Sequence, residues 1–354
     1  MAHAQRIGLH LTDRCQLDCV HCLRDPALTP TDMDVELIRQ LAAEANARFG
    51  IRQFSLTGGE PTLHPRFAEV IDILAAAGCE WDMVTNGHRF ERVTEWLQRP
   101  ERRCALRSIT FSLDGDEATH DGIRGAGSYR SVLLAITAAG AHGLPFGVQM
   151  AVHARNAGQI EAVGLLAAQL GAKHVSFPMT QPTGTHLDSP LHLPAREWRR
   201  VRDRVESLAR ALSIAVVLPE GYPNDQPMSL CGPLRGDTLH IDVRGRLTLC
   251  CQHADVPSEG EREVVGPIAE LGLTGAYRRL LDLIHATVSA RLEALDRADA
   301  GDEWRAFECN ACLRSFGKVH WSDSGASGPS AARARWRGAW AKPDHGRRKL
   351  EVIG

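Results

Sequence analysis

The chain has 354 residues, enough for one large domain or for one and a half domains of ordinary size. Its 41 Lys and Arg nearly balance its 43 Asp and Glu, and aromatic residues make up only 5%, so the basic surface and stacking platform of a nucleic-acid-binding protein are not expected. No apolar run is long enough to span a bilayer, and the N-terminus lacks the pattern of a signal peptide. We therefore expect a cytoplasmic protein with no nucleic-acid or membrane partner.

The chain contains ten cysteines, seven of which fall in groups spaced like metal ligands. Metal binding in a reducing compartment explains such groups better than disulfides do. The first group is Cys15, Cys19 and Cys22, in a Cys-x-x-x-Cys-x-x-Cys array after a short apolar run. A closed zinc site takes four ligands, whereas an iron-sulfur cluster held by three thiolates keeps one iron open for a small molecule. Zinc binding and simple burial of these cysteines are the alternatives.

From residue 6 to about 218, short apolar runs alternate with amphipathic helical patterns, which indicates an α/β fold with a parallel sheet and crossover helices. The predicted strands are 7–11, 53–57, 81–85, 108–113, 146–152, 174–178 and 214–218. Helices are predicted at about 66–77, 89–98, 128–142, 158–170 and 195–212. A further helix between the first two strands has Thr31-Asp32 as its N-cap and ends at Gly50.

A second motif closes the second predicted strand, where Gly58, Gly59 and Glu60 stand before a proline. Paired glycines permit close backbone approach to a ligand, and a carboxylate beyond them can meet an ammonium group. Taken alone, Gly-Gly-Glu is equally compatible with an ordinary turn. Its place at the end of the strand that follows the cysteine loop makes the combination much more specific.

Together the two motifs resemble those of the radical S-adenosylmethionine (SAM) enzymes. The resemblance implies a partial (βα)6 barrel with a 4Fe-4S cluster whose open iron chelates S-adenosyl-L-methionine. An electron, supplied by a donor such as flavodoxin or ferredoxin, then cleaves the sulfonium to a 5'-deoxyadenosyl radical. The resemblance assigns the cluster to Cys15, Cys19 and Cys22, and the methionine amino group to Gly58, Gly59 and Glu60. The sequence departs at His21, where the family usually has a bulkier aromatic residue.

Further predicted strand ends carry polar residues where the family places cofactor contacts. The segment at 120–125 resembles the His-Asp-x-x-Arg-Gly stretch of the peptide- and sugar-modifying branch, whose arginine can pair with a carboxylate. The candidate cofactor-binding residues are Asn86, Ser112, Asp114 and Arg124. Turn formation or helix capping is the alternative for each of them. Cys79 and Cys104, which have no partner cysteine nearby, are predicted to be small buried hydrophobes.

After residue 218 the sequence becomes rich in Pro and Gly, and a second set of cysteines begins. A hairpin is predicted at 237–243 and 246–250, and a helix at about 275–297. This arrangement resembles the twitch domain, the shortened form of the SPASM domain, which implies a second 4Fe-4S cluster. Its ligands would be Cys231, Cys250, Cys309 and Cys312. A full SPASM domain carries more cysteines, and a zinc ribbon with the same four ligands is the alternative.

The predicted organisation is a radical SAM barrel at 1–218, a twitch domain at 219–321 and a mobile extension at 322–354, which is rich in Gly, Ser, Ala and Arg.

Cys251 directly follows a predicted ligand, and adjacent strand residues point to opposite faces. Its thiol is therefore a candidate catalytic hydrogen donor in the cavity between the clusters, since an S–H bond is weaker than a typical C–H bond. Alternatively, Cys251 is the ligand and Cys250 the spare, or the spare thiol merely packs.

A Cys-Cys pair of this kind resembles the twitch-type radical epimerases, in which a hydrogen returned from the opposite face inverts a stereocentre. The competing interpretation is a dehydrogenase of aminoglycoside or aminocyclitol antibiotic biosynthesis, which oxidises a carbinol to a ketone and passes an electron to the second cluster. A third interpretation is a maturation partner or an electron carrier, and the intact Gly-Gly-Glu motif argues against it. The absence of a peptide-recognition domain before the barrel favours an aminoglycoside or amino sugar as substrate over a ribosomal peptide.

Overall fold

In the computed structural model, the described residues are 4–24, 29–181, 191–224, 226, 228–251, 261–297, 303–304 and 306–318. All of them belong to one unit of the chain, Met1–Val319. The predicted extension at 322–354 lies outside the described residues, as does the end of the predicted twitch domain.

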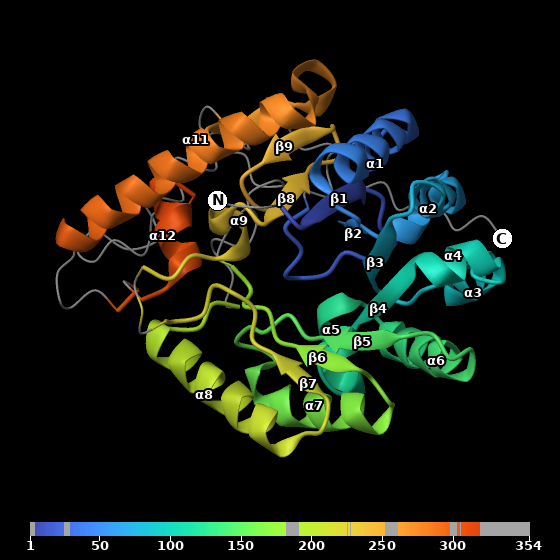
Figure 1. Ribbon diagram of the computed structural model, residues 1–354. Helices are drawn as coiled ribbons and strands as arrows, with labels where there is room; N and C mark the ends of the chain where they lie inside the picture. Colours follow the sequence, from blue (N-terminus) through green and yellow to red (C-terminus); the bar gives the residue numbers. More distant parts are fainter. Residues whose placement is uncertain are drawn as a thin grey trace. The chain divides into compact units, whose positions relative to one another are not determined.

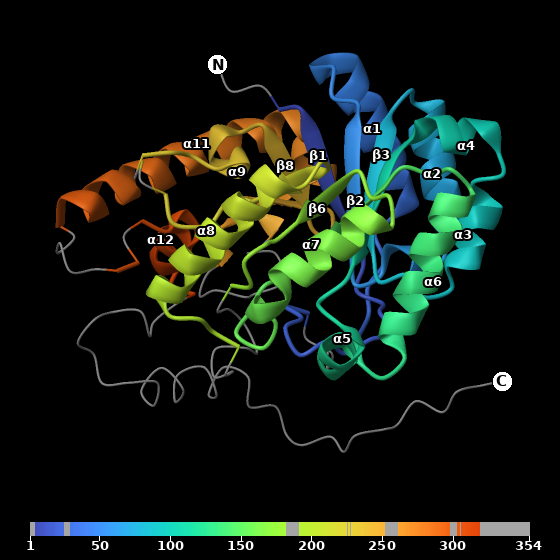
Figure 2. The same ribbon diagram turned by 90° about the horizontal axis from the view of Figure 1, so that it is seen from below.

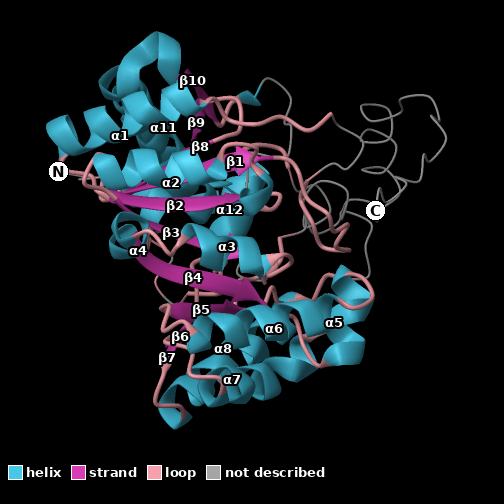
Figure 3. Ribbon diagram, turned by 90° about the vertical axis from the view of Figure 1, so that its right-hand side faces the viewer, coloured by secondary structure: helices cyan, strands magenta, loops and turns pink. Residues whose placement is uncertain are grey.

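The strands build a single sheet that is parallel over most of its width. Their bounds are β1 (Arg6–Thr12), β2 (Gln53–Gly58), β3 (Glu80–Thr85), β4 (Leu106–Ser112), β5 (Phe146–Gln149), β6 (His174–Ser176), β7 (Ala215–Val217), β8 (Thr238–Ile241), β9 (Arg246–Thr248) and β10 (Val264–Pro267). Their order is β10-β9-β8-β1-β2-β3-β4-β5-β6-β7, as Figure 3 shows from the side. Strands β1 to β7 are parallel neighbours, which confirms the predicted α/β sheet.

The predicted hairpin extends this sheet. Strand β8 pairs in parallel with β1, while β9 and β10 follow as antiparallel neighbours. Cys231 precedes β8 and Cys250 follows β9, so these two cysteines lie on the segment that extends the sheet beyond β1. Within the described chain the sheet ends at β7 and β10, so the barrel is open.

Helices cover the outer face of the curved sheet (Figures 1 and 2). Their bounds are α1 (Val35–Phe49), η1 (Pro61–Leu63), α2 (Phe67–Ala76), α3 (Phe90–Trp96), α4 (Pro100–Ala105), α5 (Glu117–Arg124), α6 (Ser128–Ala141), η2 (Ala157–Gln159), α7 (Ile160–Gln169), α8 (Ala195–Ala211), α9 (Gly232–Arg235), α11 (Ile268–Arg297) and α12 (Glu308–Ser315). Helix α11 contains the predicted helix at 275–297 and is kinked at Gly272, whose φ of 64° is not helical. No helix in the described part of the chain is both long and apolar enough to cross a membrane.

Strand β1 shows why the sheet encloses a cavity. Ile7, Leu9 and Leu11 are fully buried in the apolar core, whereas the alternate residues Gly8 and His10 line the inner cavity. A parallel strand covered on both faces usually reads as a continuous apolar run. The alternation on β1 therefore marks a strand with one packed face and one face open to a ligand.

Several expectations need correction. The N-cap of α1 is Asp34, whose side chain accepts from the Glu36 amide, and not Thr31-Asp32. Asp32 instead accepts hydrogen bonds from Thr12 and Arg14, at the start of the cysteine loop. Cys104 is exposed and not buried, because Arg102 and Ala105 form the buried face of α4. Cys79 is buried as predicted.

Candidate active site

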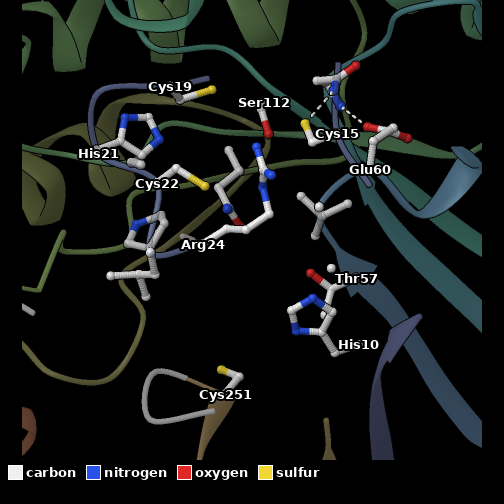
Figure 4. A pocket seen from close by; sticks show the side chains of 18 of the residues that line it. His10, Cys15, Cys19, His21, Cys22, Arg24, Thr57, Glu60, Ser112 and Cys251 are labelled. Atoms are coloured by element: carbon white, nitrogen blue, oxygen red, sulfur yellow. Dashed lines mark hydrogen bonds between the residues drawn. The ribbon is translucent and has the colours of Figure 1, made fainter. Parts of the chain in front are cut away.

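A cavity of about 310 Å³ opens inside the sheet at the carboxyl ends of the strands. It brings together the first cysteine group, the Gly-Gly-Glu motif and Cys251, although these are far apart in the sequence (Figure 4). The predicted site residues that line it are Cys15, Cys19, Cys22, Gly58, Gly59, Glu60, Asn86, Ser112, Arg124 and Cys251. Asp114 is not among the described lining residues.

The cysteine loop leaves β1 through a short polar network. Thr12 Oγ1 donates to Asp32 Oδ1 at 2.6 Å, and Arg14 Nε lies 3.0 Å from both oxygens of the same carboxylate. The Gly59 amide then donates to the Thr12 carbonyl and the Glu60 amide to the Arg14 carbonyl, each at 2.7 Å. The two motifs are thus bonded to one another through their main chains.

The two glycines are required by this backbone contact. A Cβ atom on Gly58 would collide with the Thr12 carbonyl oxygen, and the Gly58 φ of 138° is one that residues with side chains rarely adopt. A Cβ atom on Gly59 would collide with the Arg14 carbonyl oxygen and lie 2.7 Å from the Arg14 carbonyl carbon. The glycines therefore let β2 approach the cysteine loop. Sequence reasoning had interpreted them as making room for a ligand.

Replacing Gly59 with alanine is expected to destabilise the protein by about 1–3 kcal/mol, because the new methyl group must displace main-chain atoms of the cysteine loop. Iron bound by Cys15, Cys19 and Cys22 should fall with it. Thermal denaturation and iron analysis after anaerobic reconstitution would measure both. Gly158→Ala is the matched control, since a Cβ atom there meets nothing within 4 Å. Equal iron content and stability in the two variants would contradict this account.

Glu60 is almost fully buried and is the centre of a hydrogen-bond network. Its carboxylate accepts from the hydroxyls of Thr62 and Thr85, at 2.7 and 2.8 Å, and from the Asn86 amide at 2.8 Å. Burial raises the pKa of Glu60, and these hydrogen bonds oppose the shift. Asn86 Nδ2 in turn lies 3.8 Å from Cys15 Sγ. The network links the motif to the cysteine loop, and Glu60 still reaches the cavity wall.

Asp114 and Arg124 form a buried ion pair behind the cysteines. Arg124 Nε donates to Asp114 Oδ2 at 2.5 Å, and Arg124 Nη1 lies 3.9 Å from Cys19 Sγ. Burial opposes ionisation of Asp114, but Arg124 and His21 together lower its pKa. His21 Nε2 is 4.0 Å from Asp114 Oδ2. The predicted cofactor-binding pair is therefore joined internally, with only the arginine at the cavity.

The donor set fits an iron-sulfur cluster. Burial raises the pKa of Cys15, and raises that of Cys19 to about 11, so these thiols become thiolates only when a metal displaces their protons. Within the described residues, no three His, Cys, Asp or Glu side chains are arranged to hold a single metal ion. The three thiols line one cavity, and three thiolates can hold an iron-sulfur cluster that keeps one iron open (Figure 4).

The second cysteine group surrounds a separate, smaller cavity. Cys231 precedes α9, Cys250 follows β9, and Cys309 and Cys312 lie on α12, yet all four line this cavity together with Leu234, Leu249 and Leu313. Burial raises the pKa of Cys231 to about 12 and that of Cys312 to about 11. Gly221, which sequence reasoning missed, makes room for the group, since a Cβ atom there would lie 2.8 Å from Cys309 Sγ.

The adjacent residues Cys250 and Cys251 line different cavities. Cys250 lines the small one with the other three thiols, and Cys251 lines the large one. Figure 4 shows Cys251 at the opposite side of the large cavity from Cys15 and Glu60. The predicted strand at 246–250 ends at Thr248, so alternation along that strand does not account for the placement of Cys251.

Sequence reasoning missed most of the uncharged polar wall of the large cavity. His10 and Thr57 come from β1 and β2, and His240 and Thr248 from β8 and β9. A usable signal was present in β1, because polar or small residues alternate there with Ile7, Leu9 and Leu11.

Comparison with known proteins agrees with this geometry. The family model described as "Radical SAM superfamily" matches residues 9–164. The PqqA peptide cyclase of Xanthomonas axonopodis pv. citri (strain 306) is 31% identical over 268 residues, which are 72% of this chain and 69% of the relative. The mycofactocin maturase MftC of Mycobacterium tuberculosis (strain ATCC 25618 / H37Rv) is 29% identical over 248 residues, 67% of this chain and 59% of the relative. The chain spans 66% of the length of the PqqA peptide cyclase of Xanthomonas campestris pv. campestris (strain B100) and 59% of that of MftC.

The fold has solved counterparts. The structure of anSMEcpe with bound AdoMet and Cp18Cys peptide superposes with a TM-score of 0.63 at 15% identity, covering 94% of this chain and 96% of that one. That likeness concerns the fold alone. The family match, the peptide cyclase relative and the arrangement of the cysteine loop against Gly-Gly-Glu agree, and the chain belongs to the radical SAM superfamily.

Proposed function

We propose that this protein is a radical SAM epimerase that inverts a stereocentre in a ribosomal peptide, with Cys251 as the hydrogen donor. The observation that carries the proposal is the separation of Cys250 and Cys251 between the two cavities. S-adenosyl-L-methionine bound at the cluster of Cys15, Cys19 and Cys22 would supply the radical that removes a substrate hydrogen. A thiol on the opposite side of the substrate can then return a hydrogen to the other face of the carbon. The thiyl radical that this leaves would return to the thiol by taking one electron from the reductant, such as flavodoxin or ferredoxin, and one proton from solvent.

Cys250 and Cys251 have different proposed roles because they line different cavities. The four thiols of the small cavity are enough to hold a second cluster, and Cys250 is one of them. Cys251 is then not needed as a ligand, and its side chain is on the wall of the large cavity, where a substrate would bind. A dehydrogenase would have no use for a thiol at this position.

The cavity favours a peptide over the aminoglycoside preferred from sequence. Among its described lining residues the only carboxylate is Glu60, which already accepts hydrogen bonds from Thr62, Thr85 and Asn86. Arg24 and Arg124 add positive charge to the same wall. A polycationic sugar would need opposite charges there. The similarity to PqqA peptide cyclases supports the same choice of substrate class.

The test is anaerobic turnover of reconstituted protein in deuterium oxide with a pooled library of short synthetic peptides. Epimerisation replaces one C–H by C–D, so we expect a gain of one dalton in a converted peptide and a D-residue after hydrolysis and chiral analysis. A loss of two daltons without deuterium would contradict epimerisation and favour an oxidising enzyme, either a dehydrogenase or a peptide cross-linking enzyme. Deuteration of an aminoglycoside in a parallel assay, and of no peptide, would contradict the proposed substrate class.

A further inference from the structure

Two histidines from neighbouring strands face the substrate side of the large cavity. Gly8 on β1 is paired in register with His240 on β8, so His10, two residues after Gly8, points to the same face of the sheet as His240. Thr57 on β2 is paired with His10, and Thr248 on β9 with His240. These four residues form one continuous stretch of the cavity wall, with imidazoles at its centre.

A glycine on a neighbouring strand leaves space for each imidazole. A Cβ atom on Gly8 would lie 2.9 Å from His240 Nδ1, and one on Gly58 would lie 2.8 Å from His10 Cδ2. His10 Nε2 also lies 3.2 Å from Asp13 Oδ1, and His10 is only 8% exposed. Both rings therefore lie against neighbouring backbone, and a carboxylate fixes the orientation of one of them. Such support is what holds a binding group in a defined geometry.

The position of the pair indicates what it binds. In Figure 4, His10 and Thr57 lie between Glu60 on one side and Cys251 on the other, where a substrate must sit to meet both ends of the cavity. His240 offers an N–H donor, and His10, whose Nε2–H faces the Asp13 carboxylate, offers its Nδ1–H when the ring is protonated. The strongest acceptor in an uncharged peptide segment is a main-chain carbonyl. The carbon that loses its hydrogen in a peptide epimerase is directly bonded to such a carbonyl.

We propose that His10 and His240 form a subsite for the main-chain carbonyl oxygen of the peptide residue that reacts. This inference rests on the proposed function and identifies residues that determine its specificity. Hydrogen bonds from the two imidazoles hold the reacting carbon between the cysteine cluster and Cys251. They also favour electron density on the carbonyl oxygen when the neighbouring carbon becomes a radical.

The test uses a peptide that the wild-type enzyme deuterates in the library assay. His10→Phe and His240→Phe retain ring volume but remove the N–H donor, and His10→Gln restores a donor. We expect the dissociation constant of the fluorescently labelled peptide, measured without reductant, to rise about tenfold in each Phe variant, as for one lost hydrogen bond. The ratio of deuterated peptide to 5'-deoxyadenosine should fall similarly, and His10→Gln should recover part of both.

His174→Phe is the matched control. His174 lies against Gly147 on the neighbouring strand, much as His240 lies against Gly8, but it is not among the described residues that line the cavity. Peptide-independent formation of 5'-deoxyadenosine by His174→Phe, and its peptide affinity, should stay within twofold of wild type. If both Phe variants keep the wild-type peptide affinity and the wild-type ratio of deuterated peptide to 5'-deoxyadenosine, the inference is wrong while the proposed function stands. If the wild-type enzyme deuterates no peptide, the proposed function and the inference both fail.

Discussion

Cys251→Ala is expected to abolish deuterium incorporation into the peptide, with a loss of at least about a hundredfold, while 5'-deoxyadenosine still forms. The reason is that the substrate radical then has no hydrogen donor on the side of the cavity opposite Cys15 and Glu60. The peptide radical then either takes its hydrogen back from 5'-deoxyadenosine, which keeps the original configuration, or is quenched in side reactions that leave 5'-deoxyadenosine as a product. Mass spectrometry of the peptide and chromatography of 5'-deoxyadenosine from the same reaction measure the two products.

The neighbouring cysteine supplies the control. Cys250→Ala should reduce bound iron because Cys250 lines the small cavity with Cys231, Cys309 and Cys312, whereas Cys251→Ala should leave iron unchanged. If the two variants exchange these phenotypes, Cys251 is the ligand and Cys250 the spare thiol. If Cys251→Ala still gives deuterated D-peptide at the wild-type rate, the donor is a different group and the proposed role of Cys251 is wrong.

The parts of the fold that could be predicted are those set by local pattern. Each predicted strand from 7–11 to 214–218 exists, because short apolar runs between helical patterns have few other solutions in a chain of this length. The short helices α4 and α5 were missed, since α4 has only six residues and α5 carries its buried residues at only two positions, His120 and Ile123. Helices so short have little periodicity to detect.

The site was predictable where the motif itself contains the chemistry. Cys15, Cys19 and Cys22 were predicted from their spacing and Glu60 from the place of Gly-Gly-Glu at a strand end. Cys251 was predicted from alternation along a strand that in the structure ends at Thr248. The reason for Gly59 could not be found in this way, because it depends on the Arg14 carbonyl of another strand end. His240 was also beyond reach, since only the β1–β8 register places it beside Gly8. Contacts across the sheet have no local signature.

The second largest expected effect is a loss of bound iron when the four thiols of the small cavity are changed. Cys309→Ser should lower the iron content of the reconstituted protein by about half, because the remaining cluster is held by a different set of thiolates. Removal of Cys15, Cys19 and Cys22 together should also lower iron by about half, but it should abolish 5'-deoxyadenosine formation entirely. Metal analysis and the 5'-deoxyadenosine assay, applied to the same preparations, separate the two sets.

The exposed Cys104 provides the control for this series, since Cys104→Ser changes a cysteine of α4 that lines neither cavity within the described chain. Its iron content should equal that of wild type. Zinc in place of iron after Cys15, Cys19 and Cys22 are removed would contradict a second cluster and indicate a zinc ribbon with the same ligands. If Cys309→Ser keeps all of its iron, Cys309 is not a ligand. Complete loss of iron in both variants would mean that the two cysteine groups fold and load as one unit.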